Sequence, residues 1–118
     1  QVYALLGEPR MPMNRPEMGW DYSTFSPAAL PDGEQARVTG LLVRRKPGCW
    51  ITERMISHAG YDESCFLLQG ELELHLGTRV YTIRSGDSFY VPQDMLHNYL
   101  NISQEEAVCM VYFSKLIY

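Results

Sequence analysis

The sequence lacks the long apolar run, the signal peptide and the paired cysteines that would indicate a membrane or secreted protein. No stretch is long and apolar enough to cross a bilayer, and no signal-peptide pattern begins at Gln1. The 3 cysteines are an odd number, and their spacing shows no pairs. Because a disulfide framework needs paired cysteines, we expect a cytoplasmic protein that makes no contact with membranes.

Positive charge is also scarce. The formal net charge is −4 at pH 7, and the basic run Arg44-Arg45-Lys46 is too short to hold nucleic acid phosphates. We therefore expect no direct contact with nucleic acid. The sequence also lacks a phosphate-binding glycine loop, a nucleophile elbow and a paired-cysteine zinc motif, so none of these chemistries is indicated.

The first 35 residues differ in composition from the rest of the chain. Residues 7–32 hold 5 of the 7 prolines, and no helical or strand period continues there. We predict an extended arm over residues 1–35, with one short strand at 20–25, and a single domain over residues 36–118. The apolar residues of the arm would be costly to leave in water, so we expect them to cover a sheet edge or a neighbouring subunit. A poorly ordered terminus is the alternative.

From residue 36 onward, short apolar segments alternate with turn signals. Leu72, Leu74 and Leu76 alternate with polar residues, which indicates a strand with one wet face. No segment has the period of an amphipathic helix. Many short strands at this spacing indicate an all-β sandwich or barrel of the jelly-roll kind. The predicted strands cover residues 38–45, 50–57, 63–68, 71–76, 79–83, 88–91, 97–101 and 107–113.

Two histidines and one carboxylate, His58, Glu63 and His97, are expected at the starts or middles of short strands separated by tight turns. Side chains in such positions can converge inside a small barrel. Two imidazoles and one carboxylate suit a divalent metal ion. The sequence therefore predicts a metal site within the barrel.

The segment from Gly86 to Asn101 resembles the second conserved motif of the cupin superfamily. Five residues separate Gly86 from Pro92, and His97 and Asn101 follow at the spacing of the motif. One position departs from the motif, because Asp94 stands where it has a glycine.

The segment from His58 through Glu63 to Gly70 resembles the first cupin motif. That motif usually has two histidines two residues apart, and Ile56 replaces the first of them. The resemblance covers residues 36–114 and implies a double-stranded β-helix, the jelly-roll barrel of cupins, with a metal or ligand pocket in its mouth. Cupin barrels commonly pair their sheets, so the resemblance also implies a homodimer.

Among cupins, the sequence resembles that of the small sensor cupins joined to helix-turn-helix regulators. Trp20-Asp21-Tyr22 and the run Gly86-Asp87-Ser88-Phe89-Tyr90-Val91-Pro92 carry this likeness. The chain contains no helix-turn-helix of its own. Two alternatives therefore stay open: a DNA-binding part has been removed, or the chain is a stand-alone relative.

Because Ile56 cannot ligate a metal, at most three of the four usual cupin ligands remain: His58, Glu63 and His97. This set matches the facial triad of non-haem Fe(II) and also serves Mn, Zn, Ni or Co. It leaves positions open for water and substrate. The alternative is a site that no longer holds metal, in which both histidines hydrogen-bond to Glu63 or to the carboxylate of a ligand.

Four further residues are predicted to line a ligand pocket: Arg54, Ile56, Cys65 and Tyr99. Tyr99 lies two residues after His97, and Cys65 two after Glu63, so each shares the face of a predicted ligand. Arg54 is a candidate clamp for a substrate carboxylate. The alternatives are an Arg54 that reaches solvent and a Cys65 that is a small buried apolar residue.

Two other polar residues are given structural interpretations. His75 lies among glutamates on the polar side of its strand and is predicted to be a surface residue. Asn101 ends a strand, where a turn-forming function is favoured over catalysis.

Two functions follow from these observations. The first, which the sensor likeness and Ile56 favour, is a domain that binds a small molecule, with a divalent metal in the barrel, and acts as the ligand sensor of a regulator or as a stand-alone binding protein. The second, which the surviving ligand set favours, is a mononuclear metal-dependent enzyme, an oxygenase or isomerase acting on a small molecule.

Overall fold

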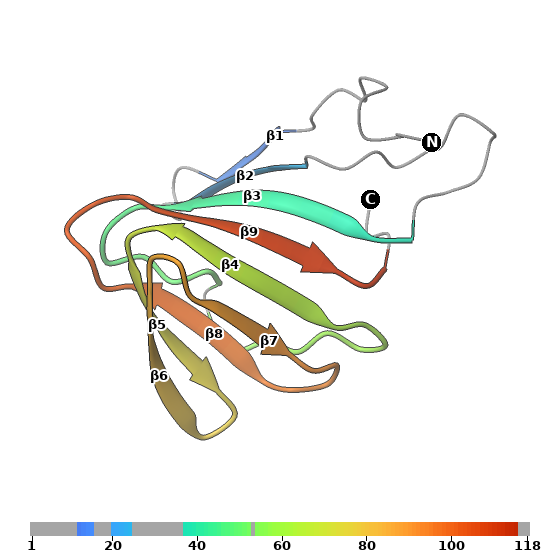
Figure 1. Ribbon diagram of the computed structural model, residues 1–118. Coiled ribbons are helices and arrows are strands. Elements are labelled where there is room, and N and C mark those ends of the chain that lie inside the picture. Colours follow the sequence, from blue (N-terminus) through green and yellow to red (C-terminus); the bar gives the residue numbers. More distant parts are fainter. Residues whose placement is uncertain (1–11, 16–19, 25–36, 53, 116–118) are drawn as a thin grey trace.

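The computed structural model describes residues 12–15, 20–24, 37–52 and 54–115 (Figure 1). These residues form nine strands and no helix, and thus no helix that could span a membrane. In chain order the strands are β1 (Pro12–Arg15), β2 (Trp20–Thr24), β3 (Thr39–Arg45), β4 (Glu63–Gln69), β5 (Glu71–Leu76), β6 (Arg79–Arg84), β7 (Ser88–Val91), β8 (His97–Asn101) and β9 (Ala107–Phe113).

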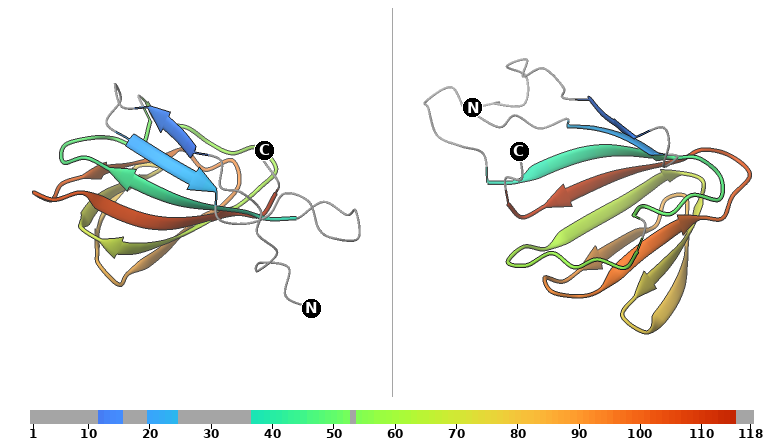
Figure 2. Two further views of the ribbon diagram at one scale, coloured as in Figure 1. Left: turned by 90° about the horizontal axis from the view of Figure 1, so that it is seen from above. Right: turned by 180° about the vertical axis from the view of Figure 1, so that it is seen from behind.

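The strands form two sheets that face each other (Figures 1 and 2). The larger sheet has six strands in the order β1-β2-β3-β9-β4-β7, and the smaller has three in the order β6-β5-β8. All neighbouring strands pair antiparallel. Strands adjacent in the chain thus often lie in different sheets, as a jelly roll requires, and the predicted fold class is confirmed.

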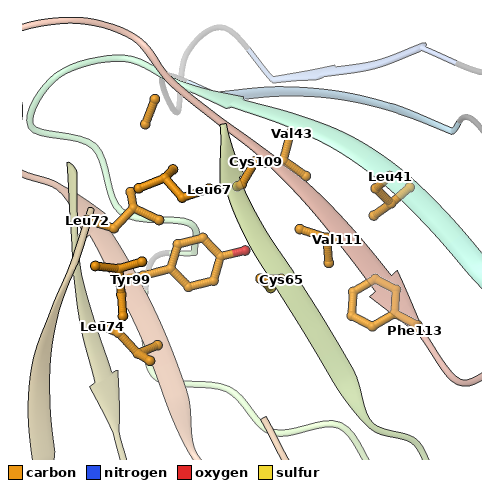
Figure 3. Close-up of a cluster of buried hydrophobic side chains, with 12 residues drawn as sticks. Leu41, Val43, Cys65, Leu67, Leu72, Leu74, Tyr99, Cys109, Val111 and Phe113 are labelled. Carbon is orange, nitrogen blue, oxygen red and sulfur yellow. The ribbon is translucent and has the colours of Figure 1, made fainter. Parts of the chain in front are cut away.

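The core lies between the two sheets (Figure 3). In β4, buried and exposed residues alternate, because successive side chains of a strand point to opposite faces. Burial of such inward side chains is the main force that holds the sheets together, at roughly 25 cal/mol per Å² of apolar surface. The buried cluster consists of Leu41, Val43, Cys65, Leu67, Leu72, Leu74, Ile83, Tyr99, Ala107, Cys109, Val111 and Phe113.

The described part of the N-terminal arm forms a hairpin at the edge of the larger sheet. β2 pairs with β3 from Trp20, opposite Arg45, to Thr24, opposite Leu41. This confirms the short strand predicted at 20–25, of which residues 20–24 are paired. That the apolar side chains of the arm cover a sheet edge stays a prediction. β1 was not predicted, because its proline hid the signal; a proline is tolerated here because Pro12 is the first residue of an edge strand. The predicted boundary at residue 35 lies outside the described residues.

In the segment 50–57, predicted to be a strand, the described residues form two isolated bridges instead. Trp50 pairs with Leu100, and Ile56 pairs with His97. Between them the side chain of Asn98 takes over the backbone pairing: Thr52 N donates to Asn98 Oδ1 at 3.2 Å, and Asn98 Nδ2 donates to Thr52 O at 3.1 Å. A side chain that bonds backbone groups in this way offers an alternative to the sheet ladder, so the strand prediction was wrong.

The turn between β4 and β5 depends on Gly70. This residue has φ +93°, and a Cβ atom there would lie 2.9 Å from the Cα of Ala107. Only glycine adopts this backbone without strain, and only glycine allows so close an approach of β9. The turn thereby carries the chain from the larger sheet to the smaller one.

Candidate metal centre

The three predicted ligands meet between the two sheets. Glu63 is the first residue of β4 in the larger sheet, and His97 is the first residue of β8 in the smaller one. His58 lies in the loop that leads into β4, so its predicted place on a strand was wrong. Residues distant in the chain are thus brought to one end of the barrel, and we call His58, Glu63 and His97 the triad.

The triad is compact and nearly closed to solvent. His58 Nε2 lies 2.9 Å from Glu63 Oε1, and His97 Nε2 lies 3.4 Å from the same oxygen. The three potential ligand atoms all lie within 4.8 Å of one another. Side-chain exposure is 13% for His58, 3% for Glu63 and 1% for His97, so the site is most open at His58.

Hydrogen bonds on the far side of each imidazole orient the two histidines. The Nδ1–H of His97 donates to the carbonyl oxygen of Met95 at 2.9 Å, which leaves Nε2 as the nitrogen that faces Glu63. His58 Nδ1 lies 3.0 Å from the hydroxyl of Tyr61. Metal-binding histidines are commonly oriented by such a bond at the second nitrogen.

The carboxylate is oriented in the same manner. The thiol of Cys65 donates to Glu63 Oε2 at 3.0 Å, so Oε1 is the oxygen turned toward the two imidazoles. Each member of the triad thus has one atom held from behind and one atom directed at a common centre. Two nitrogens and one carboxylate oxygen in this arrangement fit a divalent cation.

The backbone around the triad is also fixed. Ile56 N donates to His97 O at 2.9 Å, and His97 N donates to Ile56 O at 2.7 Å. Asp94 N donates to His58 O at 2.9 Å and thereby ties the loop before β8 to the loop before β4. Asp94 has φ +66°, which explains why the cupin motif usually has a glycine at this position.

The charges in the triad support one another. Burial alone would raise the pKa of the Glu63 carboxyl, but hydrogen bonds from His58, His97 and Cys65 outweigh it and lower the pKa to about 2. Burial alone would lower the pKa of His97, but the bond to Glu63 prevails and raises it. Glu63 is therefore ionised at neutral pH, and the raised pKa of His97 makes the neutral imidazole that a metal ion requires less favourable than in an ordinary histidine.

The four predicted pocket residues lie in different surroundings. Arg54 is exposed, and Ile56 is half-buried opposite His97. Cys65 is 1% exposed and Tyr99 is 2% exposed, and both belong to the packed core. Burial raises the pKa of both groups well above their usual range, and the charge of Glu63 adds to this for Cys65. That these four residues line a pocket stays a prediction.

Two aromatic residues of the site were not predicted. The ring of Tyr61 stacks on His58 with centroids 4.8 Å apart. Phe113, the last residue of β9, contacts the His58 ring edge-on at 5.1 Å. Its position could have been found by extending the inward alternation of Cys109 and Val111 by one step; Tyr61 lies in a loop, where no period applies.

The two structural interpretations of polar residues hold well. Asn101 is buried, and its Nδ2 donates to Glu105 O at 2.8 Å while its Oδ1 accepts from Ser103 N at 2.9 Å, which confirms the turn-forming function. His75 lies on β5 with 28% of its side chain exposed and bonds Glu73 at 2.7 Å.

An all-β jelly roll with a buried cluster of two histidines and one glutamate at one end defines a class of small barrel proteins suited to hold one divalent ion. Comparison with known families identifies the class more closely: the family described as "Cupin domain" matches residues 41–113. The chain therefore belongs to the cupin family, as its two motifs predicted.

Individual relatives give further context. Polyketide synthase CurC from Streptomyces cyaneus is 30% identical over 84 residues, which are 71% of this chain and 53% of that protein. The chain thus spans about half the length of this curated relative. A putative sugar phosphate isomerase from Acidithiobacillus ferrooxidans has a TM-score of 0.62 at 27% identity, over 69% of this chain and 52% of that one.

KdgF from Halomonas sp. has a TM-score of 0.69 at 15% identity, over 93% of this chain and 89% of that chain. At this identity the likeness is one of fold alone. It extends over nearly the whole of both chains.

Proposed function

We propose that this cupin binds one divalent metal ion through the triad and uses it to bind a small molecule that carries carbonyl or hydroxyl oxygens. The observation that carries the proposal is the convergence of three ligand atoms within 4.8 Å in a buried site. Charged groups are seldom buried together unless they are paired or bind a metal. With three protein ligands, coordination positions stay open for the small molecule.

The charge and the exposure of the triad residues suggest how each would contribute to binding the ion and the small molecule. A bound divalent ion would act as a Lewis acid on an oxygen of the small molecule. Glu63 supplies the negative charge that balances a dication in the barrel interior, and its low pKa keeps it ionised. His58, the most exposed member, lies on the side from which a small molecule would reach the centre.

The names of two relatives support an enzyme among the possible functions. One is described as a polyketide synthase and the other as a putative sugar phosphate isomerase. Polyketides and sugar phosphates both carry carbonyl and hydroxyl oxygens, which are ligands for a hard divalent cation. We propose a metal-dependent reaction on such a molecule, an isomerisation or an oxygenation.

A ligand sensor is the second candidate, and Ile56 favours it. A site with an aliphatic side chain in place of the fourth usual ligand has lower metal affinity and more apolar surface. A sensor would bind its small molecule without turnover, whereas an enzyme would convert it. The homodimer, the cytoplasmic location and the absence of contact with nucleic acid stay predictions.

Metal analysis tests the proposal. We expect about one divalent ion per chain after purification without chelator, by elemental mass spectrometry, or after reloading the metal-free protein with Fe(II), Mn, Zn or Ni. His97→Ala should lose this ion. His75→Ala is the matched control, because His75 also bonds a glutamate but lies outside the triad. A wild-type chain that binds no ion, or equal losses in both variants, would contradict the proposal.

A further inference from the structure

Cys65 and Tyr99 lie behind the triad, and the proposed function assigns them no task. Cys65 is on β4 two residues after Glu63, on the same inward face. Its thiol donates to Glu63 Oε2 at 3.0 Å in fully buried surroundings. Donor atoms that converge on the metal centre come from the triad alone among the described residues, so the thiol contacts a ligand without being one.

Tyr99 continues this contact to the opposite sheet. It is on β8 two residues after His97, and its ring extends toward β4 with the hydroxyl beside Cys65 (Figure 3). Tyr99 thus packs beside Cys65, whose thiol in turn bonds Glu63.

We propose that Cys65 is a positioning residue of the metal centre, whose thiol holds Glu63 Oε2 so that Oε1 is presented to the ion. The inference rests on the proposed metal site. A free carboxylate can rotate and offer either oxygen or both, whereas one oxygen held from behind leaves a single atom for the ion. Partners of this kind typically change metal affinity by about 10- to 100-fold. A thiol is a weak donor, so we expect the lower end of that range.

Cobalt(II) binding to the full-length, metal-free chain tests this inference. Cys65→Ala removes the donor, Cys65→Val removes it while filling the space, and Cys65→Ser keeps a hydroxyl donor. Cys109→Ala is the matched control, since Cys109 is equally buried on the neighbouring strand β9 but its thiol has no bond to Glu63 among the described residues. The measurements are the cobalt dissociation constant, the visible d–d spectrum and thermal unfolding of each variant.

We expect about tenfold weaker cobalt binding and an altered d–d spectrum for Cys65→Ala and Cys65→Val. Cys65→Ser should stay near wild type in both readouts. Cys109→Ala should lose thermal stability, because it opens a cavity in the same core, while its cobalt affinity and spectrum stay unchanged. The spectrum separates positioning from packing, because lost packing alone does not change the coordination of the ion.

Three results would overturn the inference. Equal affinity and spectrum in Cys65→Val and wild type would show that the thiol does not orient the carboxylate. A sulfur-to-cobalt charge-transfer band that disappears in the Cys65 variants would make Cys65 a ligand instead. If the wild type and Cys109→Ala bind no cobalt, the proposed metal site itself fails, an outcome distinct from the first two.

Discussion

Within the described part of the chain, two glutamates, Glu63 and Glu73, each lie within 3 Å of a histidine, and their surroundings differ greatly. His58 lies 2.9 Å from Glu63, and the glutamate is 3% exposed with a second histidine 3.4 Å away. His75 lies 2.7 Å from Glu73, and the two side chains are 28% and 37% exposed. The first pair lies between the sheets, whereas the second is on the outer side of β5, where Trp50 contacts the imidazole at 5.0 Å.

Burial gives the two pairs different energies and different uses. An exposed pair is surrounded by water and contributes about 0 to 1 kcal/mol. A buried carboxylate needs several partners to offset its loss of hydration, and Glu63 has three: His58, His97 and Cys65. The same partners that stabilise Glu63 also orient it. With His97 the number of potential metal ligands reaches three, which makes the cluster a candidate metal site. The distance within a pair therefore says little about function until its surroundings are known.

Metal affinity should separate the two glutamates most strongly. Glu63→Gln removes the negative charge of the triad and replaces a good ligand oxygen with a poor one, so we expect divalent metal binding to fall at least about a thousandfold, about 4 kcal/mol. Glu73→Gln should leave it unchanged. Isothermal titration of the metal-free proteins with Zn or Co measures both. Similar losses of metal affinity in the two variants would contradict the prediction that only the buried pair binds metal.

The stability of the protein in acid should also distinguish Glu63 from Glu73. The pKa of Glu63 falls from the ordinary 4.5 to about 2 on folding, so its contribution is complete above pH 4.5 and is lost as pH falls through about 2. In metal-free protein this amounts to about 3 kcal/mol of unfolding free energy. Denaturant unfolding between pH 5 and 2 should show this loss in wild type and in Glu73→Gln. Glu63→Gln should be less stable at pH 5 and should lose about 3 kcal/mol less than wild type over that range.

The loop around Asp94 offers a smaller test. The buried pair depends on the bond from Asp94 N to His58 O, whereas His75 lies on a regular strand. Asp94→Val should destabilise the protein by about 1 to 2 kcal/mol, because a β-branched residue is strained at φ +66°. Gln93→Val, at an exposed neighbour without a positive φ, is the control. Equal melting temperatures of the two variants would show that the loop conformation carries no strain.

Local pattern was enough to predict most of the barrel. The alternation of Leu72, Leu74 and Leu76 defined β5 to the residue, and the predicted strands at 88–91, 97–101 and 107–113 match β7, β8 and β9. The motif spacing also placed Glu63 and His97 at strand starts. Period and spacing are properties of the chain itself, so no tertiary contact was needed to find them.

The strand prediction failed where a residue distant in the sequence changed the local backbone pairing. The segment 50–57 has the composition of a strand, but the backbone of Thr52 bonds the side chain of Asn98, which lies 46 residues further along the chain. The face of Cys65 and Tyr99 was predicted correctly from strand alternation. The burial of Cys65 was one of the predicted alternatives, but the burial of Tyr99 was not predicted, because it depends on how closely β8 approaches β4 in the finished barrel.

The amino-acid order by itself determined the class of fold, the positions of the turns and which side chains share a face with the ligands, since these follow from a period of two and from glycine and proline. The folded barrel decided which of two similar histidine–glutamate pairs is buried, which oxygen of Glu63 faces the centre, and where Cys65 ends up. The physical reason is that dehydration and orientation of a polar group depend on all the elements packed around it, and these come together only across the two sheets.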